Sequence, residues 1–436
     1  MKINLERLEK NLKELSQFGR NKDGGIDRSL GSEAEEEARS WLLEKALDMG
    51  AAIKIDAMAN IWINWKRTNC ENKPITLGSH HDAVPDGGMY DGALGVLMGL
   101  EILQTLKENQ VPLNHPLQVV SFTAEEPNPF NISTMGSRGV TGKLTLEQLQ
   151  ASSHLITGES LTAAIKRAGG NLQGLLKAQL RKNDMAAFIE CHIEQGRNLY
   201  DNQLSAGTVT KITGIYRELI TVKGEANHAG TTIMEHRHDA FLAAAQAALV
   251  VEETVKALNR RDVVGTVGWF EVSPNSANII SGNTKFIMEI RFPEELIKQK
   301  ILLSINKEYT EIENIRGLCF HREIILDQAP APMDDRIMKI IGEEISKEQS
   351  PLPPSAEESS GLEFVEHVPM LVSMAGHDAV HMSDITKTGM IFVQSIEGKS
   401  HCREEKTDSK DIEIAGNAML NAVLRLDKEL TYENLN

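Results

Sequence analysis

No apolar run in the 436-residue sequence approaches the about 20 residues that a helix needs to span a bilayer, so no membrane-spanning segment is expected. Basic residues are also in short supply. The 46 Lys and Arg residues face 62 Asp and Glu residues, and the formal net charge of −16 argues against binding to a phosphate backbone. No Lys/Arg stripe with interleaved aromatic residues offsets this balance, so nucleic acid is not expected as a partner.

Cysteine is scarce as well. The chain has four cysteines that are far apart and form no Cys-x-x-Cys pair: Cys70, Cys191, Cys319 and Cys402. This usage fits a reducing cytosol rather than a disulfide framework. Cys191 and Cys402 each adjoin a histidine, but we expect both to be isolated buried thiols. The first ten residues are charged and helical in period, unlike a signal peptide, so a cytoplasmic protein is expected.

The sequence does contain a regular alternation of helical segments and short β-branched runs. Residues 1–50 have helical periodicity, and the segment 93–106 is a helix with an apolar face. Three predicted strands each lead into a residue with a chemically useful side chain: Ile75–Gly78 into His80, the buried Leu117–Thr123 into Glu125, and Ala187–Cys191 into His192. This alternation predicts an α/β fold with a mostly parallel sheet and helices on both faces.

The pattern changes between about Lys211 and Leu326. Strands and helices are expected here in the order β-α-β-β-α-β, at residues 217–223, 237–258, 263–272, 283–291, 293–309 and 318–326. This is the order of a ferredoxin-like split unit. We therefore expect a second domain of residues 212–326 inserted into a catalytic domain of residues 1–211 and 327–436. The Pro-rich stretch 350–355 is expected to be a loop.

The segment Gly78-Ser-His-His-Asp-Ala-Val-Pro-Asp-Gly-Gly-Met-Tyr-Asp-Gly contains the first group of candidate functional residues. It follows a strand, and ligands of open α/β sheets bind at the carboxyl ends of strands. A histidine, an aspartate two residues later and a second aspartate in a Gly-rich loop suit a divalent cation. The imidazole can be a ligand, one carboxylate can fix its tautomer, and the loop aspartate can bridge two metals. Taken alone, the segment also fits an ordinary polar loop.

Other strand ends carry residues of the same kinds. Glu125 and Glu126 are adjacent carboxylates, which is a costly arrangement unless a cation or a shared proton offsets their repulsion. One of them can bind metal while the other takes a proton from the attacking water. His192 ends one further strand, and His401 follows a strand at 390–393. A lone histidine is usually structural, but ligand-type residues at four strand ends favour a metal site.

Taken in order, the segments Gly-Ser-His-x-Asp…Asp-Gly, Glu-Glu, His-Ile-Glu-Gln-Gly, Asn-His-Ala-Gly-Thr-Thr and Gly-x-Ser-His resemble the M20 metallopeptidase-like superfamily. Within it, they are similar to the branch of N-carbamoyl-L-amino-acid hydrolases, allantoate amidohydrolases and β-ureidopropionases. The segments span residues 78–405, so the resemblance covers nearly the whole chain.

The resemblance implies a site for two divalent ions. The implied ligand sets are His80, Asp91 and His192 for one ion, and Asp91, Glu126 and His401 for the other, with Asp91 bridging. It also implies that Asp82 orients His80 and that Glu125 is the general base. The ions can be zinc, manganese, cobalt or nickel, because sites of histidine and carboxylate accept all four.

The resemblance also implies substrate-binding residues and a homodimer. In the family, the histidine corresponding to His228 reaches into the partner subunit's active site to stabilise the oxyanion, so the inserted domain would serve for dimerisation and as a lid. Asn278 and Arg291 match residues that hold the substrate carboxylate, and a guanidinium fork suits that role. Gln195 and the backbone of Gly376 match further substrate contacts.

The chain departs from the family pattern near the substrate. Pro127 stands where allantoate-type members often carry a third glutamate, and Ile233 and Ser281 stand where proline is usual. His81 occupies a position that is usually aliphatic or an amide. These changes leave the metal ligands intact and concern the leaving group and the side-chain pocket.

The expected activity is metal-assisted hydrolysis of the carbamoyl amide of a small N-carbamoyl amino acid, which yields the amino acid, ammonia and carbon dioxide. An allantoate amidohydrolase, and more widely a metallo-aminoacylase or dipeptidase, are the alternatives within the same chemistry. A metal-binding or regulatory protein without turnover is an alternative of another class, against which Glu125 argues as an acid–base group with no ligand role. A serine hydrolase is disfavoured because the sequence has no Gly-x-Ser-x-Gly motif.

Overall fold

The computed structural model describes residues 1–65 and 72–433, and Cys70 lies outside this part of the chain. The chain divides into two compact units, one of Met1–Thr210 with Pro332–Asn436 and one of Lys211–Ala331. The limits expected from the sequence for the second unit were residues 212 and 326. Each unit has its own sheet and its own hydrophobic core.

The first unit is built on a ten-stranded sheet with the order β14-β15-β8-β16-β7-β4-β6-β3-β2, in which β13 also pairs with β8. Its strands are β2 (Ala52–Ile55), β3 (Ile61–Trp65), β4 (Ile75–His80), β6 (Leu117–Phe122), β7 (Ala187–Ile193), β8 (Ala206–Ile212), β13 (Ala331–Pro332), β14 (Glu363–Val365), β15 (Val368–Ser373) and β16 (Thr388–Val393). The central neighbours β6, β4, β7 and β16 run parallel. The pairs β2–β3, β3–β6, β8–β16 and β14–β15 are antiparallel. The carboxyl ends of the four central strands therefore lie along one edge of the sheet.

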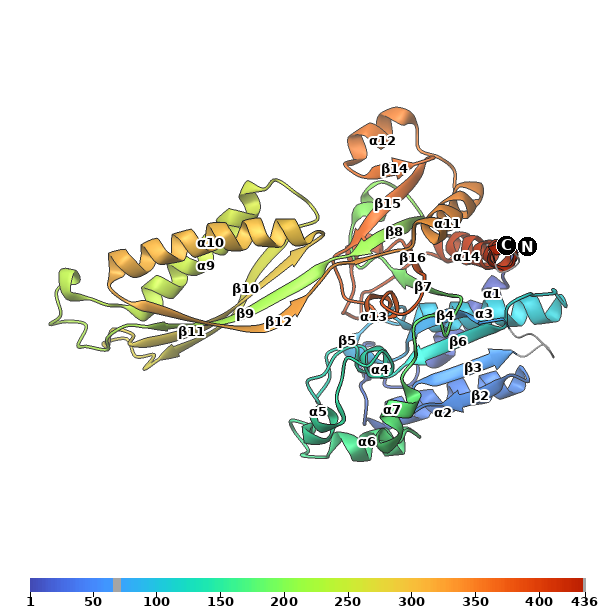
Figure 1. The fold of residues 1–436 in the computed structure, drawn as a ribbon, viewed down its shortest axis with the longest axis horizontal. Helices are drawn as coiled ribbons and strands as arrows, with labels where there is room; N and C mark the ends of the chain where they lie inside the picture. The colour runs from blue at the N-terminus through green and yellow to red at the C-terminus, as the bar shows by residue number, and fades with distance from the viewer. Residues whose placement is uncertain (66–71, 434–436) are drawn as a thin grey trace. The chain divides into compact units, whose positions relative to one another are not determined.

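Helices cover this sheet on both faces, and the predicted α/β fold is confirmed. Strands β4, β7 and β16 are buried along their whole length, and because alternate residues of a strand point to opposite faces, neither face is open to solvent there. Helix α3 packs on β4, β6 and β7, α11 and α14 pack on each other and on β16, and α13 packs on β7 and β16 (Figure 1). The helices of this unit are α1 (Leu5–Leu15), α2 (Glu33–Asp48), α3 (Ala93–Glu108), α4 (Met135–Val140), α5 (Leu146–Ala151), α6 (Leu161–Arg167), α7 (Leu175–Ala178), α8 (Asn198–Asp201), α11 (Asp335–Glu348), α12 (Pro354–Ser360), α13 (Ala379–Met382) and α14 (Ser409–Glu433).

Local sequence explains several element boundaries. The side chains of Asn4 and Ser32 accept backbone N–H groups at the starts of α1 and α2. A short pair of strands, β1 (Ile26–Arg28) and β5 (Ala83–Gly87), lies outside the main sheet. The prediction of a loop over residues 350–355 is wrong for its last two residues, because α12 begins at Pro354. A helix tolerates proline in its first turn.

The second unit contains a four-stranded antiparallel sheet of order β10-β11-β9-β12. Along the chain its elements are β9 (Gly214–Lys223), α9 (Ala240–Ala257), β10 (Val264–Ser273), β11 (Asn283–Phe292), α10 (Glu295–Arg316) and β12 (Cys319–Gln328). Burial alternates along β9 and β11, as expected when helices cover only one face of a sheet. Helices α9 and α10 lie side by side on that face (Figure 1).

No helix among the described residues combines the length and the apolar character needed to cross a membrane. Cys191 is buried, as expected, and Cys319 is exposed. Cys402 is only half-buried rather than buried, because it lies on the loop of the exposed His401.

Candidate metal and catalytic site

The parallel centre of the first sheet brings the predicted ligands together at one edge. His80 is the last residue of β4, His192 lies near the end of β7, and Glu126 follows β6. Asp91 comes just before α3, in a turn that depends on Gly92. This glycine has a φ of 62°, and a Cβ atom built on it would lie 2.3 Å from Cε1 of His80. A side chain at this position would therefore push Asp91 away from the imidazole.

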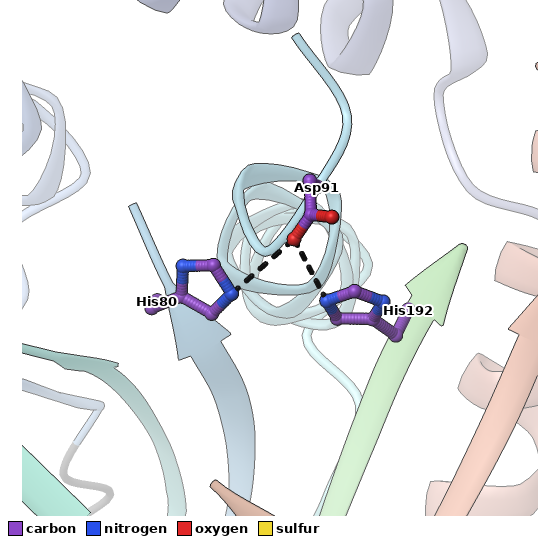
Figure 2. A group of neighbouring side chains, drawn as sticks. All are labelled: His80, Asp91 and His192. Carbon is purple, nitrogen blue, oxygen red and sulfur yellow. Dashed lines mark ion pairs between the residues drawn. The ribbon is translucent and has the colours of Figure 1, made fainter. Parts of the chain in front are cut away.

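The two oxygens of Asp91 face different groups of side chains. Oδ1 lies 3.5 Å from Nε2 of His80 and 3.2 Å from Nε2 of His192 (Figure 2). Oδ2 lies 3.5 Å from Nε2 of His401, and Nε2 of His401 lies 3.3 Å from Oε1 of Glu126. Asp91 thus belongs to two ligand groups at once. The first group is buried, whereas His401 leaves the second open to solvent.

Hydrogen bonds on the far side of each buried imidazole fix which nitrogen faces Asp91. Nδ1 of His80 lies 3.2 Å from the carbonyl oxygen of Asp82 and 3.4 Å from its carboxylate. Nδ1 of His192 lies 2.9 Å from the carbonyl oxygen of Ile193. A proton on Nδ1 in both rings leaves the lone pair on Nε2, which is the tautomer that a metal ligand requires.

Asp82 does more than the sequence suggested. Its Oδ1 accepts the backbone N–H of Glu125 at 3.2 Å, and its Oδ2 accepts the N–H of Glu126 at 3.1 Å. Ala124 lies just before this pair with a φ of 51°, a conformation that costs free energy for a residue with a side chain. Asp82 therefore holds the loop of the two glutamates as well as the His80 ring.

Several buried carboxylates raise one another's proton affinity at this edge. Burial raises the pKa of Glu125 well above its ordinary value, and the carboxylates of Glu126 and Asp378 add to this while His80 opposes it. Burial likewise raises the pKa of Glu126, against the effect of His401. Burial also acts to raise the pKa of Asp91, but the His192 and His80 rings outweigh it and leave that pKa well below its usual range. A cation would relieve the repulsion within this cluster.

The geometry of the donor atoms fits divalent cations. Ligand atoms bound at about 2.0–2.1 Å around a tetrahedral ion lie about 3.3–3.4 Å apart. The distances from Asp91 to the three histidines and from His401 to Glu126 are 3.2–3.5 Å, and all ligand atoms of each group lie within 4.8 Å of one another. In addition, Oε1 of Glu126 is buried without a hydrogen bond, and its near neighbour is Nε2 of His401 at 3.3 Å, another donor atom of the same group. Imidazole and carboxylate donors suit zinc, manganese, cobalt or nickel.

Two other clusters of ligand-type residues occur among the described residues. One joins His80 with Glu125 and Glu126, so Glu125 lies beside the metal ligands without belonging to either group that contains Asp91. The other joins Glu190, His192 and His377. The two oxygens of Glu190 already accept hydrogen bonds from Ser79 Oγ at 2.6 Å and from Ala379 N at 2.9 Å, which favours a structural role for that cluster.

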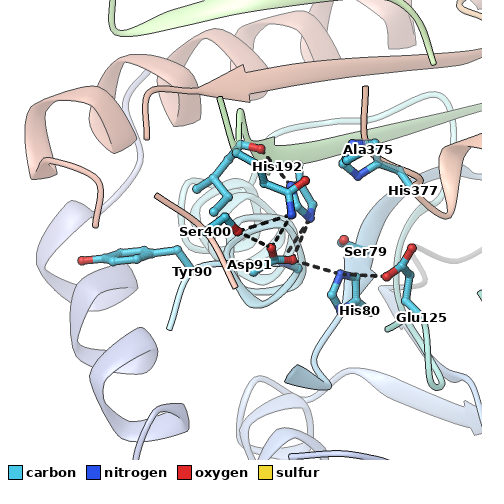
Figure 3. Close-up of polar contacts among 12 residues, drawn as sticks. Ser79, His80, Tyr90, Asp91, Glu125, His192, Ala375, His377 and Ser400 are labelled. Atoms are coloured by element: carbon cyan, nitrogen blue, oxygen red, sulfur yellow. Dashed lines mark hydrogen bonds and ion pairs between the residues drawn. The ribbon is translucent and has the colours of Figure 1, made fainter. Parts of the chain in front are cut away.

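Several residues that sequence reasoning passed over surround Asp91. Ser400 Oγ lies 2.9 Å from Oδ2 of Asp91 (Figure 3). It also lies 3.0 Å from Oε2 of Glu405. The ring of His377 packs edge-on against His192 with the centroids 4.5 Å apart. Ser400 precedes His401 in the Gly-x-Ser-His motif, and that position could have indicated it. Nothing in the sequence near Glu405 points to Asp91.

The predicted substrate residues are distributed over both units. Nε2 of Gln195 donates to Oδ2 of Asp91 at 2.6 Å and lies 3.3 Å from Nε2 of His401, so it contacts the ligand groups directly. Gly376 lies half-buried in the loop between β15 and α13. His228, Asn278 and Arg291 lie in the second unit.

Within the second unit, Asn278 and Arg291 are far apart. Strand β11 pairs Asn283 with Lys223 at one end and Arg291 with Ile215 at the other. The ladder continues beyond Asn283, where Ala229 N donates to the carbonyl oxygen of Asn278 at 3.0 Å, which brings Asn278 close to His228. The paired stretch from Asn283 to Arg291 spans about 26 Å at about 3.3 Å per residue. Asn278 lies beyond Asn283, so Asn278 and Arg291 are separated by about 26 Å or more. Arg291 pairs with Ile215, which follows closely in the sequence after Lys211, where the second unit begins.

Comparison with known proteins assigns the chain to a family. The profile of "Peptidase family M20/M25/M40" matches residues 76–425. The N-carbamoyl-L-amino acid amidohydrolase of Geobacillus stearothermophilus is 33% identical over 97% of this chain and 98% of its own. The allantoate amidohydrolase of Bacillus subtilis is 32% identical over 94% of this chain and 95% of its own.

A solved structure agrees with these relatives. The crystal structure of an amidase of the hydantoinase/carbamoylase family from Burkholderia multivorans superimposes with a TM-score of 0.82, at 28% identity over 98% of each chain. The M20 family is metal-dependent, in keeping with the ligand groups around Asp91. With a family match over most of its length and relatives of the same chemistry, the chain belongs to the peptidase family M20/M25/M40 and is a hydrolase that acts on amide C–N bonds.

Proposed function

We propose that this hydrolase cleaves the carbamoyl amide of an N-carbamoyl amino acid, releasing the amino acid, ammonia and carbon dioxide. The observation that carries the proposal is the placement of Glu125. Its Oε2 lies 3.7 Å from Nε2 of His80, beside two ligand groups that share Asp91, and it belongs to neither of those groups. A carboxyl group in that position is free to handle a proton during hydrolysis.

The residues around Asp91 would hold two divalent ions. The first group is His80, Asp91 and His192, and the second is Asp91, Glu126 and His401. When bound, the ions would polarise the carbonyl group of the substrate and make the attacking water more acidic. Asp82 would keep His80 in the required tautomer through Nδ1 and hold the backbone of Glu126 in place.

Glu125 would act twice. It would first accept a proton from the attacking water at its carboxylate and would then deliver that proton to the leaving nitrogen. The burial that raises its pKa suits both steps, because a general base works best when its pKa is near the working pH. His228 would donate to the developing oxyanion, and Gln195 and the Gly376 backbone would position the substrate.

Arg291 and Asn278 would hold the carboxylate of the substrate. In this structure, Nε of Arg291 donates to Oε1 of Glu289 at 2.9 Å, and the other oxygen of Glu289 accepts hydrogen bonds from Arg217. Glu289 thus fixes one edge of the guanidinium. A fixed planar guanidinium suits recognition of a carboxylate, because two parallel hydrogen bonds then form with little further loss of entropy.

We propose further that the enzyme works as a homodimer in the cytoplasm. The distance between Asn278 and Arg291 in one chain, about 26 Å or more, exceeds the length of an N-carbamoyl amino acid. Contacts of both residues with one substrate would therefore need two chains, and an isologous pair joined through residues 211–331 would supply them. In this arrangement the second unit, a ferredoxin-like insert, serves for dimerisation and as a lid.

Allantoate is the second candidate substrate, because the allantoate amidohydrolase of Bacillus subtilis is nearly as similar to this chain as the N-carbamoyl-L-amino acid amidohydrolase of Geobacillus stearothermophilus. Pro127 in place of a third glutamate favours the carbamoyl substrate. A panel of N-carbamoyl amino acids, ureidopropionate, allantoate, acyl amino acids and dipeptides, assayed for amine and ammonia release with added zinc or manganese, tests the proposal. The highest kcat/KM on an N-carbamoyl amino acid is the expected result, and turnover only of acyl amino acids or dipeptides would refute it.

A further inference from the structure

Glu405 lies outside both candidate ligand groups, yet it is buried directly against Asp91. Its Oε1 accepts the backbone N–H of Tyr90 at 2.9 Å and the N–H of Asp91 at 3.1 Å. Its Oε2 lies 3.0 Å from Oγ of Ser400, which in turn lies 2.9 Å from Oδ2 of Asp91. One carboxylate therefore contacts both the backbone and, through a hydroxyl, the side chain of Asp91.

The surrounding backbone leaves space for this carboxylate. A Cβ atom built on Gly88 would lie 2.2 Å from Oε1 of Glu405, so the close approach depends on a glycine there. The side chain of Tyr90 points away from the cluster, which leaves its backbone N–H as its contribution to the contact (Figure 3). The loop before α3 is thus shaped to receive Glu405.

Glu405 also links two loops that carry different ligands. Ser400 and Glu405 flank His401, and they contact Asp91 across a sequence separation of more than 300 residues. His401 belongs to one ligand group, while Asp91 belongs to both. A shift of Asp91 would therefore disturb both groups, whereas loss of Glu126 would disturb only one.

We infer that Glu405 is a positioning residue that sets the bridging geometry of Asp91 and so controls the affinity of both metal positions together. The inference rests on the proposed two-metal site. Residues that orient metal ligands typically change metal affinity by about 10- to 100-fold when they are removed. Because Asp91 is the shared ligand, the loss is expected at both positions.

The test is a titration of metal-free protein with Zn²⁺ in competition with a chromophoric chelator, analysed for two sites. Glu405→Ala should weaken both positions by about 10- to 100-fold. Glu405→Gln should recover much of the affinity, because its amide oxygen can still accept the N–H groups of Tyr90 and Asp91. Glu404→Ala is the matched control. Glu404 is also a glutamate and precedes Glu405 directly, but it is exposed and pairs with Arg403. Its affinities should equal those of the wild type.

Thermal unfolding separates positioning from a general structural effect. In the metal-free protein, Glu405→Gln removes a negative charge beside Asp91, so its melting temperature should equal or exceed that of the wild type. Its gain in melting temperature on adding Zn²⁺ should be smaller than the wild-type gain. If Glu405→Ala does not fold, Ser400→Ala replaces it. That change removes the hydroxyl between Glu405 and Asp91, together with its contact to Nε2 of Gln195 at 3.3 Å, and should also weaken both positions.

Wild-type affinity at both positions in a folded Glu405→Ala or Ser400→Ala variant would overturn the inference. Equal losses in Glu405→Ala and Glu405→Gln would overturn it as well, because they would assign the effect to charge rather than to hydrogen bonding. The proposed function fails separately: a wild-type protein that binds two Zn²⁺ ions but hydrolyses no ureido substrate would refute the function and leave the role of Glu405 standing.

Discussion

The positions of the candidate substrate residues at opposite ends of the second sheet predict which pairs of impaired variants restore activity when they are mixed. Arg291 lies at one end of this sheet, paired with Ile215, and His228 and Asn278 lie at the other end, about 26 Å or more away. In the proposed dimer, a given active site takes Arg291 from the chain that supplies Glu125 and takes the distant pair from the partner. Variants at opposite ends of the sheet should therefore complement each other.

The magnitude follows from the symmetry of the dimer. When Arg291→Ala and Asn278→Ala are mixed in equal amounts with free subunit exchange, half of the dimers are mixed. In each mixed dimer one site carries both defects and the other carries neither, so the mixture should reach about one quarter of the wild-type activity. His228→Ala mixed with Glu125→Gln should reach the same level.

The control is a pair of variants at the same end. A mixture of His228→Ala and Asn278→Ala leaves each site of a mixed dimer with one defect, so no recovery is expected. Glu125→Gln with Arg291→Ala should also fail, because in the proposed dimer both residues serve the site of their own chain. These two negative pairs distinguish a shared site from simple stabilisation of one variant by the other.

The assay is ammonia release from an N-carbamoyl amino acid before and after exchange, with the fraction of mixed dimers measured by mass spectrometry of differently tagged chains. If the Arg291→Ala and Asn278→Ala mixture stays inactive although mixed dimers are present, the two residues do not meet at one site. Recovery in the His228→Ala and Asn278→Ala mixture would equally refute the reasoning, because those two residues would then serve different sites.

Five further changes test the site itself. A chelator should abolish hydrolysis and added divalent metal should restore it, whereas full turnover by protein shown to be metal-free by elemental analysis would contradict the central assignment. Asp91→Ala should lower the content of both ions. Glu125→Gln should keep both ions and lose activity by at least about 100-fold, whereas Glu126→Ala should lower the metal content. If Glu125→Gln loses the metal and Glu126→Ala keeps it, the roles assigned to the two residues are reversed. Arg291→Lys should raise KM for a carboxylate-bearing substrate because an ammonium group cannot form the bidentate pair, and an unchanged KM would exclude that role.

The ligand groups could be predicted from the sequence because their residues sit at strand ends. His80, Glu126 and His192 each end or follow a central strand, and parallel pairing of β4, β6 and β7 places those ends on one edge. Identifying these residues as candidate ligands did not require the order of the strands in the sheet. Their positions at strand ends singled out these ligand-type residues, whereas their division into two groups came from the resemblance to the M20 superfamily. The structure brings them to within 3.2–3.5 Å of their neighbours.

Other features could not be predicted because they depend on contacts between distant segments. The contact of Glu405 with Asp91 joins residues that are 314 positions apart, and no local pattern indicates it. The separation of Asn278 and Arg291 also needed the register of β9 and β11, since their spacing of thirteen residues is equally compatible with a tight turn. Pro354 is a different case: it was expected in a loop, but it begins α12, where proline is favoured because its fixed φ suits the first turn and its missing N–H is not needed there.

Two carboxylates outside the ligand groups explain how separate segments form one site. Asp82 joins the end of β4 to the loop after β6, because it contacts Nδ1 of His80 and the backbone N–H groups of Glu125 and Glu126. Glu405 joins the loop of Asp91 to the loop of His401. The first link ties one ligand to the proposed base, and the second ties the shared ligand to the solvent-exposed one. The distance between Glu125 and the metal positions therefore depends on both links, so a change in either one should alter metal affinity and proton transfer together.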